Sequence, residues 1–163
     1  MTIFGKSVGE YVAFAKPLLI LIIVVGIIRL ALSLGGAPTS VAWWFSMTAV
    51  AWAGVVYYAI RVHTSGFGSY KHLLPICILG GIATQIVVVP SIILAILTGT
   101  DNVFSVPEAF FGSDGKTWLH VAGHLVMGTT VGPTILWLLG CVVMFVTKKV
   151  VNKEEDKKAA ASA

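Results

Sequence analysis

Four long apolar stretches, separated by short polar or turn-forming segments, dominate the pattern of the chain. They cover residues 17–34, 41–61, 73–97 and 117–146. A helix of about 17 to 25 apolar residues is long enough to cross the hydrocarbon core of a bilayer. Lipid surrounds such a helix, so apolar residues occur on all its sides rather than on one face. The pattern therefore predicts an all-α integral membrane protein with four transmembrane helices in an antiparallel bundle.

The segment ahead of the first stretch, residues 1–16, is expected to form a short amphipathic helix at the membrane surface. Ser7 and Glu10 have the spacing of a capping box, with a serine at the cap and a glutamate three positions later. Pro17 follows and is expected to kink or restart the helix. The sequence thus predicts an interfacial segment that leads into the first span.

Turn and proline signals refine the other spans. Thr39 or Ser40 is expected to cap the second span after a turn that contains glycines and a proline. Pro90 in the third span and Pro133 in the fourth each lack a backbone N–H. Each is expected to bend its helix, and Pro133 frees the carbonyl of Thr129.

The composition fits the same class. Of the 163 residues, 57% are hydrophobic and only 11% are charged, against about 25% charged residues in an ordinary soluble domain. The net charge of +4 would suggest nucleic acid as the partner of a soluble protein. Here the basic residues lie in short segments that flank the spans, so we expect no nucleic-acid partner and interpret them as topology signals.

The distribution of lysine and arginine predicts the orientation. With four spans, nine basic residues lie on one side of the membrane, while Lys116 lies on the other and Arg29 within the first span. Such a bias marks the cytoplasmic side, which places both termini in the cytoplasm of a bacterial-type inner membrane. The residues on this side are Lys6, Lys16, Arg61, Lys71, Lys148, Lys149, Lys153, Lys157 and Lys158.

Three segments follow from this topology. Residues 1–16 form the interfacial segment, residues 17–147 the transmembrane domain, and residues 148–163 a charged, partly disordered cytoplasmic tail. The lysine pair Lys148 and Lys149 is expected to end the fourth helix.

The clearest candidate site is a pair of histidines near the start of the fourth span. His120 and His124 are four residues apart, which places both imidazoles on one face of a helix. Together with Glu108 or Asp114 they could hold a divalent metal, because imidazole and carboxylate are zinc and copper ligands. Alternatively His124 could bind a haem whose second ligand comes from another helix, with Met47 as the candidate at similar depth.

Two other interpretations of the histidines stay open. With Arg29, the pair His120 and His124 could line a path for protons or anions. In the simplest case the two side chains only donate and accept hydrogen bonds between helices. His63 and His72 flank the second connection and could meet at the cytoplasmic surface, where a haem between them is conceivable.

Other residues are expected to serve packing. Ala49 and Ala53 form one small-xxx-small pair, and Gly128 and Gly132 form a GxxxG pair, both suited to close contact between helices. Among the polar residues within spans, Gln85 is expected to form a hydrogen bond to another helix. Arg29 is expected to tether the first span to the acidic connection near Asp101, Glu108 and Asp114. The two cysteines, Cys77 and Cys141, are interpreted as packing residues.

No nucleophile–base–acid constellation is visible, so we expect a non-enzyme. The leading hypothesis is a non-catalytic structural or accessory subunit that packs against other membrane subunits or itself. The alternatives are a haem- or metal-binding protein, possibly for electron transfer, that uses His120 and His124, and a small oligomeric channel or transporter. Apart from the lipid bilayer, the identity of the partners is not predicted.

Overall fold

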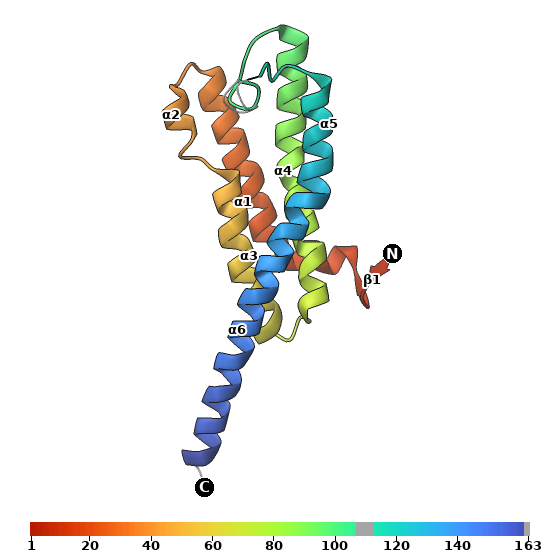
Figure 1. Cartoon of the computed structure of the whole chain (residues 1–163), viewed down its shortest axis with the longest axis vertical. Helices are drawn as coiled ribbons and strands as arrows, with labels where there is room; N and C mark the ends of the chain where they lie inside the picture. Colours follow the sequence, from red (N-terminus) through yellow and green to blue (C-terminus); the bar gives the residue numbers. More distant parts are fainter. Residues whose placement is uncertain (107–112, 162–163) are drawn as a thin grey trace.

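The computed structural model describes residues 1–106 and 113–161, with side chains as far as residue 152. Most of it is helical (Figure 1). The elements in chain order are β1 (Thr2–Ile3), β2 (Lys6–Ser7), α1 (Val8–Leu34), α2 (Thr39–Ala42), α3 (Met47–Thr64), α4 (Tyr70–Thr98), α5 (Trp118–Val126), η2 (Met127–Val131) and α6 (Gly132–Ala161).

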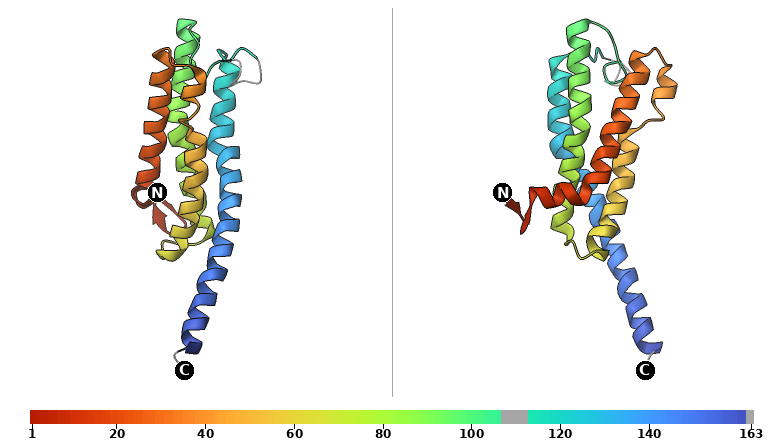
Figure 2. Two further views of the ribbon diagram at one scale, coloured as in Figure 1. Left: turned by 90° about the vertical axis from the view of Figure 1, so that its left-hand side faces the viewer. Right: turned by 180° about the vertical axis from the view of Figure 1, so that it is seen from behind.

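Within the described residues, four helical stretches are long and apolar enough to cross a membrane. This confirms the prediction of a helical chain with four membrane-length segments. Their bounds are Val8–Leu34, Thr39–Thr64, Tyr70–Thr98 and Trp118–Asn152. Connections lie at two ends of the molecule (Figures 1 and 2). We call these the hairpin end, with β1, β2 and the α3–α4 connection, and the His120 end, with the α4–α5 connection.

Helix α1 begins at the predicted capping box. The Ser7 hydroxyl accepts from the Glu10 N–H at 3.2 Å, and the Glu10 carboxylate accepts from the Ser7 N–H at 2.7 Å. The interfacial segment and the first span form one helix, Val8–Leu34, with Pro17 inside it. Its first turns lie across the long axis of the molecule, and the rest runs along that axis (Figure 2). A bend is the expected consequence of the N–H that Pro17 lacks.

The second span is divided, and the prediction of its cap is wrong. Thr39 and Ser40 are the first residues of the short helix α2, which ends at Ala42. Helix α3 begins only after Ser46, whose hydroxyl accepts from the Ala49 N–H at 3.2 Å. The physical reason is that any serine or threonine hydroxyl ahead of a helix can serve as its N-cap. The Ser46 hydroxyl caps α3, whereas no side-chain hydrogen bond caps α2.

The fourth span combines three elements. Between α5 and α6 lies the π-helical turn η2, and the Gly132 N–H donates to the Met127 carbonyl five residues before it. Pro133 follows directly, so the helix adapts to the missing N–H of this proline by a wider turn. The helical backbone of α6 then continues to Ala161, past the expected end at Lys148 and Lys149.

Helix α4 is the central helix of the bundle. It packs against α1, α3, α5 and α6. In the most apolar part of α4, 50% of the residues are buried, against 11% in α1 and 17% in the fourth span. Helix α4 therefore sits in the protein interior, while α1 and the fourth span leave most of their apolar surface uncovered by this chain.

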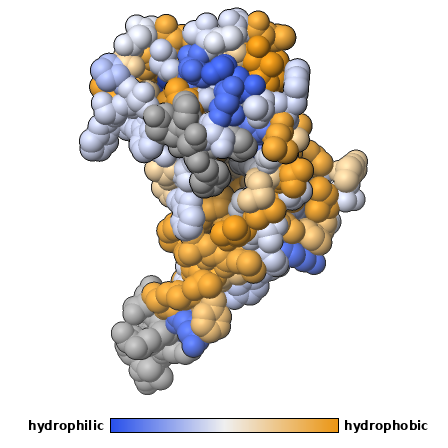
Figure 3. All heavy atoms as spheres, turned by 45° about the horizontal axis from the view of Figure 1, so that its top comes forward, coloured by the Kyte–Doolittle hydropathy of each residue, from blue (hydrophilic) through white to orange (hydrophobic). Residues whose placement is uncertain are grey.

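The buried side chains form two clusters, one above the other along the bundle. The cluster toward the hairpin end includes Tyr11, Val55, Tyr58, Leu73 and Met144. The cluster toward the His120 end includes Ile22, Met47, Val88, Ile92 and Phe104. Hydrophilic side chains gather at the His120 end, with hydrophobic ones over the helices beyond it (Figure 3).

At the hairpin end, cationic side chains lie over aromatic rings. The cation-to-ring distance is 4.5 Å for Lys6 and Phe67, and 4.1 Å for Lys148 and Tyr70. Arg61 and Lys71 make similar contacts at 5.4 and 5.5 Å, with Phe14 and Phe4 respectively. Such contacts let a cation remain near a ring at the boundary between apolar and polar surroundings.

Candidate functional site

The start of α5 holds the two histidines of the candidate site together. The Thr117 hydroxyl caps α5 by accepting from the His120 N–H at 3.2 Å. The two imidazole rings lie on one face, with ring centroids 4.9 Å apart and planes at 47°. The predicted juxtaposition of His120 and His124 is thus present, and His120 is only 3% exposed.

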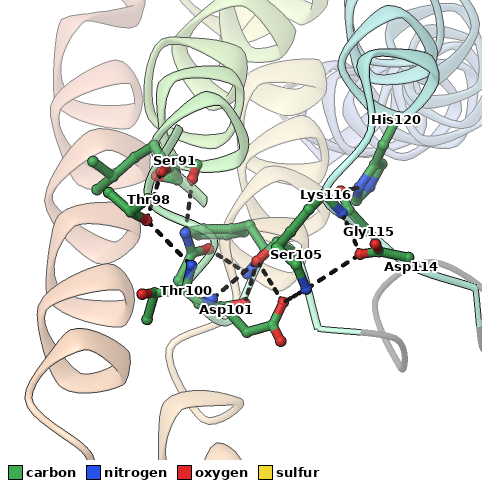
Figure 4. A network of polar contacts seen from close by, with 12 residues as sticks. Ser91, Thr98, Thr100, Asp101, Ser105, Asp114, Gly115, Lys116 and His120 are labelled. Carbon is green, nitrogen blue, oxygen red and sulfur yellow. Dashed lines mark hydrogen bonds and ion pairs between the residues drawn. The ribbon is translucent and has the colours of Figure 1, made fainter. Parts of the chain in front are cut away.

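His120 is also bonded to the backbone that precedes its helix. Its Nδ1 lies 2.8 Å from the Gly115 carbonyl oxygen (Figure 4). A carbonyl only accepts, so Nδ1 carries the proton and donates. The pairing fixes the ring against the connection between α4 and α5, which is a structural role of the kind expected for a buried imidazole.

The proposed carboxylate ligands do not join the histidines. Asp114 instead accepts from the Lys116 N–H at 2.9 Å and lies 3.2 Å from the Lys116 ammonium. Within residues 1–106 and 113–161, no three His, Cys, Asp or Glu side chains are close enough to hold a metal ion. Glu108, the other candidate, lies outside the described residues. The described part of the chain therefore provides two of the ligands proposed for a metal but not a third.

The haem ligand proposed opposite His124 faces another part of the bundle. Met47 is 2% exposed and lies close to Gly26. It lines a cavity in the centre of the bundle that His124 does not line. In the other histidine pair, His63 and His72, the ring of His72 is not suited to an axial role either. His72 Nδ1 accepts from the Ser69 N–H at 3.0 Å, and its Nε2 lies 3.1 Å from the Phe4 carbonyl, so both ring nitrogens are used.

Arg29 contacts the α4–α5 connection through an aromatic ring. Its guanidinium carbon lies 5.3 Å from the centroid of the Phe104 ring. Among the described residues, its buried Nε has no hydrogen-bond partner and no carboxylate forms an ion pair with it. The expected tether to this connection is present, but the π face of Phe104, rather than a described acid, is what Arg29 meets.

The connection after α4 contains a buried polar turn that the sequence analysis did not single out. Asn102 is 1% exposed and donates through Nδ2 to the Ser91 carbonyl at 2.7 Å, while its Oδ1 accepts from the Phe104 N–H at 3.0 Å. The Ser105 hydroxyl accepts from the Asn102 N–H at 2.9 Å (Figure 4). The Ser33 hydroxyl accepts from the Val103 N–H at 2.8 Å, which joins this turn to α1.

The signal for this turn is an asparagine three residues before a serine. Asparagine hydrogen-bonds its own backbone two residues on, as Asn102 does with the N–H of Phe104. Acidic residues and phenylalanines surround it, a pattern that predicts either a flap at the membrane surface or a short re-entrant turn. In the structure, Val103 and Phe104 of this turn are buried.

Lys116 forms ion pairs with both ends of the α4–α5 connection. Its ammonium lies 2.7 Å from Asp101 and 3.2 Å from Asp114. The hydrogen bond to Asp101 raises the pKa of Lys116, and the N–H of Lys116 lowers the pKa of Asp114. Both carboxylates are exposed and the Lys116 side chain is partly exposed, so salt will weaken the ion pairs.

We expect the connection to be ordered between roughly pH 5 and 9 and to loosen on both sides. Below the ordinary aspartate pKa of about 3.9, the depressed pKa of Asp114 means that its contribution is lost as pH falls. Above the ordinary lysine pKa of about 10.4, the raised pKa of Lys116 means that its contribution is lost as pH rises. Hydrogen exchange of residues 99–106 measures this. Lys116→Met should remove the dependence at high pH but leave much of the dependence at low pH, because the backbone N–H of residue 116 still donates to Asp114. Loosening at high pH that survives in this variant would contradict the assignment.

The centre of the bundle contains a mostly apolar cavity of about 270 Å³, which we call the central cavity. Met47, Trp52, Ile76 and Pro133 contribute to its wall. Gln85 also lines it and is 8% exposed, and within the part of the chain that the structure describes its Oε1 has no hydrogen-bond partner. The expected bond from Gln85 to another helix is therefore missing for this oxygen among the described residues.

A second hollow, of about 560 Å³, lies between α1 and α3, and we call it the α1–α3 groove. Ala49 and Ala53 are exposed and line it, together with Leu21 and Tyr57. The intramolecular contact between these helices is made instead by Gly54, beside the side chain of Leu18.

Of the GxxxG pair, only Gly128 lies against another helix. A Cβ at Gly128 would collide with the side chain of Gln85, while a Cβ at Gly132 would meet only the Met127 carbonyl of the preceding turn. Gly81 of α4 approaches the Gly128 carbonyl and the ring of Pro133 from the other side.

Comparison of the chain with protein-family models, with curated proteins and with solved structures finds no match.

Proposed function

We propose that this protein is a non-catalytic integral-membrane subunit that packs against other membrane proteins, or against copies of itself, in a larger assembly. The observation that supports this proposal is the α1–α3 groove. Two small side chains, Ala49 and Ala53, lie exposed in it. In a bilayer, small residues allow two helix backbones to approach closely, and packing at such surfaces drives association.

The shape of the groove suits a transmembrane helix of a partner. Leu21 and Tyr57, 49% and 51% exposed, provide large apolar side chains beside the two alanines. An incoming helix would place its own side chains between them and its backbone over Ala49 and Ala53. Lipid tails could cover the same surface, but they gain less from a groove that is lined by small residues and fixed in shape.

The positions of the cations support an orientation. Lys6, Arg61, Lys71 and Lys148 contact aromatic rings at the hairpin end. By the positive-inside rule, this end faces the cytoplasm. The proposal therefore keeps both termini in the cytoplasm, with a bacterial-type inner membrane as the location and His120 toward the outer face.

The other two hypotheses receive less support. A haem or metal site would need further ligands beside His120 and His124, and the described residues do not bring them there. An oligomeric channel or transporter would need association as well, so the same experiment bears on it.

Association is tested with Ala49→Leu and Ala53→Leu, singly and together. Two added leucine side chains fill the groove, so we expect the assembly extracted in mild detergent to fall to the mass of a single chain, 17.3 kDa. Native mass spectrometry of material from the original membrane measures the mass and identifies the partner. Ala31→Leu is the matched control, because Ala31 is exposed on α1 and does not line the groove. A wild-type protein that is already a single chain in the membrane would overturn the proposal.

A further inference from the structure

The central cavity goes beyond the proposed subunit role, because it lies inside this chain and away from most of the α1–α3 groove. Helices α1, α3 and α4 form three of its sides, and η2 with α6 forms the fourth. A Cβ at Gly80 would have only Ile22 near it, at 3.8 Å, so there is open space over this part of α4. A dry apolar cavity of about 150 Å³ already binds benzene, and this one is about 270 Å³.

The cavity has a polar group that the fold leaves without a partner. Gln85 is 8% exposed, and its Oε1 forms no hydrogen bond with the described residues. A buried amide oxygen without a partner destabilises a protein, and in lipid no water replaces the missing donor. The terminal torsion of glutamine is soft, so this amide can turn toward an occupant while the backbone stays in place.

Water alone is a poor occupant. Each buried water needs two to four polar partners, and the cavity wall is mostly apolar. Of the two threonine hydroxyls in the wall, that of Thr84 already donates to the Gly80 carbonyl at 3.1 Å. An apolar body with one hydrogen-bonding group matches the wall better. A hydroxyl suits a carboxamide in either orientation, because it donates to the oxygen and accepts from the NH₂ group.

The wall also favours an aromatic body. The Met47 thioether lines the cavity, and methionine sulfur makes favourable contacts with aromatic rings. Trp52 and Ile135, 47% and 52% exposed, line the cavity from α3 and α6. Because these two side chains also face the surroundings of the bundle, an occupant can enter sideways from the hydrocarbon region.

We propose that the central cavity binds a membrane-soluble aromatic alcohol, of the chemistry of a phenol or a hydroquinone ring, whose hydroxyl pairs with the Gln85 amide. The ring fills the space beside Met47 and over Gly80. The occupant enters from the lipid between α3 and α6.

The test uses the full chain in phosphatidylcholine nanodiscs, with ¹³C-methyl methionine observed by NMR. Met47 lines the cavity, and Met1, 96% exposed, is the internal reference. We expect 4-butylphenol to shift the Met47 methyl signal saturably and to leave Met1 unchanged. Its ether 4-butylanisole, which cannot donate, should bind about five- to tenfold more weakly, the ratio that corresponds to one hydrogen bond of ordinary net strength. The saturated 4-butylcyclohexanol keeps the hydroxyl but has no aromatic ring to contact the Met47 sulfur, so it should also bind more weakly than the phenol.

Two variants complete the test. Gln85→Leu should bind the phenol and its ether equally well and should itself remain folded, because it removes a buried amide oxygen that has no partner among the described residues. Gly80→Leu fills the cavity and should abolish the Met47 shift with both probes. Gly123→Leu is its matched control, because a Cβ at Gly123 meets nothing within 4 Å. If Met47 does not respond to any probe, the cavity does not bind compounds of this chemistry and the proposal is overturned. A preference for phenol that survives in Gln85→Leu, or equal binding of 4-butylcyclohexanol, overturns it as well.

Discussion

Replacing Gly81 by alanine should destabilise the bundle by about 1–3 kcal/mol, although the change adds only one methyl group. A Cβ at Gly81 points at the backbone carbonyl of Gly128 and lies 2.7 Å from the ring of Pro133. A backbone carbonyl in a helix cannot move aside as a flexible side chain can. The added carbon therefore pushes α4 and the fourth span apart where their backbones approach each other.

The neighbouring glycine is the matched control for this prediction. At Gly80 an added Cβ would meet only Ile22, at the ordinary contact distance of 3.8 Å. Because alanine also favours a helix over glycine by up to about 1 kcal/mol, Gly80→Ala should be neutral or stabilising. Reversible unfolding of both variants in mixed micelles gives the comparison. If Gly81→Ala and Gly80→Ala change the free energy of unfolding equally, the close contact between α4 and η2 does not stabilise the packing of these two helices.

Asn102→Ala should cost about 2–3 kcal/mol and should release the turn that follows α4. The side chain of Asn102 donates to the Ser91 carbonyl and accepts from the Phe104 N–H, both in buried surroundings. An alanine leaves the Phe104 N–H buried without an acceptor, which costs about 1–3 kcal/mol, and removes a second bond. Phe104 also contacts Arg29, so the loss should spread to the end of α1.

Two measurements check this second prediction. The free energy of unfolding should fall, and amide hydrogen exchange should accelerate at residues 99–106 but not in α3. Asn152→Ala, at an exposed position of α6, should change stability by no more than about 0.5 kcal/mol. Unchanged exchange at residues 99–106 in Asn102→Ala would mean that the two side-chain bonds do not hold the turn in place.

The spans were predictable because lipid imposes a minimum length on an apolar helix, and the capping box at Ser7 and Glu10 was predictable because it needs only local spacing. The cap of the second span was not predictable, because several hydroxyls of equal chemistry precede it and only one of them, Ser46, accepts from the N-terminus of α3. Local signals thus locate helices, but they do not choose between equivalent ends.

Packing was harder to predict for a related reason. A helix that is apolar on all sides carries no pattern that says which side faces the protein. Ala49 and Ala53 lie exposed in a groove, while the nearby Gly54 makes the contact with α1. Likewise, only Gly128 of the GxxxG pair meets another helix.

In the candidate site, too, local spacing predicted one part and tertiary packing decided the rest. The shared face of His120 and His124 follows from helical spacing and is present. Whether other ligands approach depends on how the connection before α5 folds, and there Asp114 pairs with Lys116 instead. Met47 and Gln85 were singled out from the sequence for other reasons, and their common position beside the central cavity depends on three-dimensional packing.

The wide turn η2 rotates the side chains of α5 about the helix axis relative to those of α6. One extra residue in a single turn rotates everything beyond it by about 100° relative to an unbroken α-helix. This offset accompanies a change of neighbours: α5 packs on α4, whereas α6 packs on both α3 and α4. Deleting one residue from Met127–Val131 would bring the two halves back into phase and swing the imidazole face of α5 around the helix axis. The length of this one turn, as much as the identity of its residues, therefore sets where His120 and His124 point.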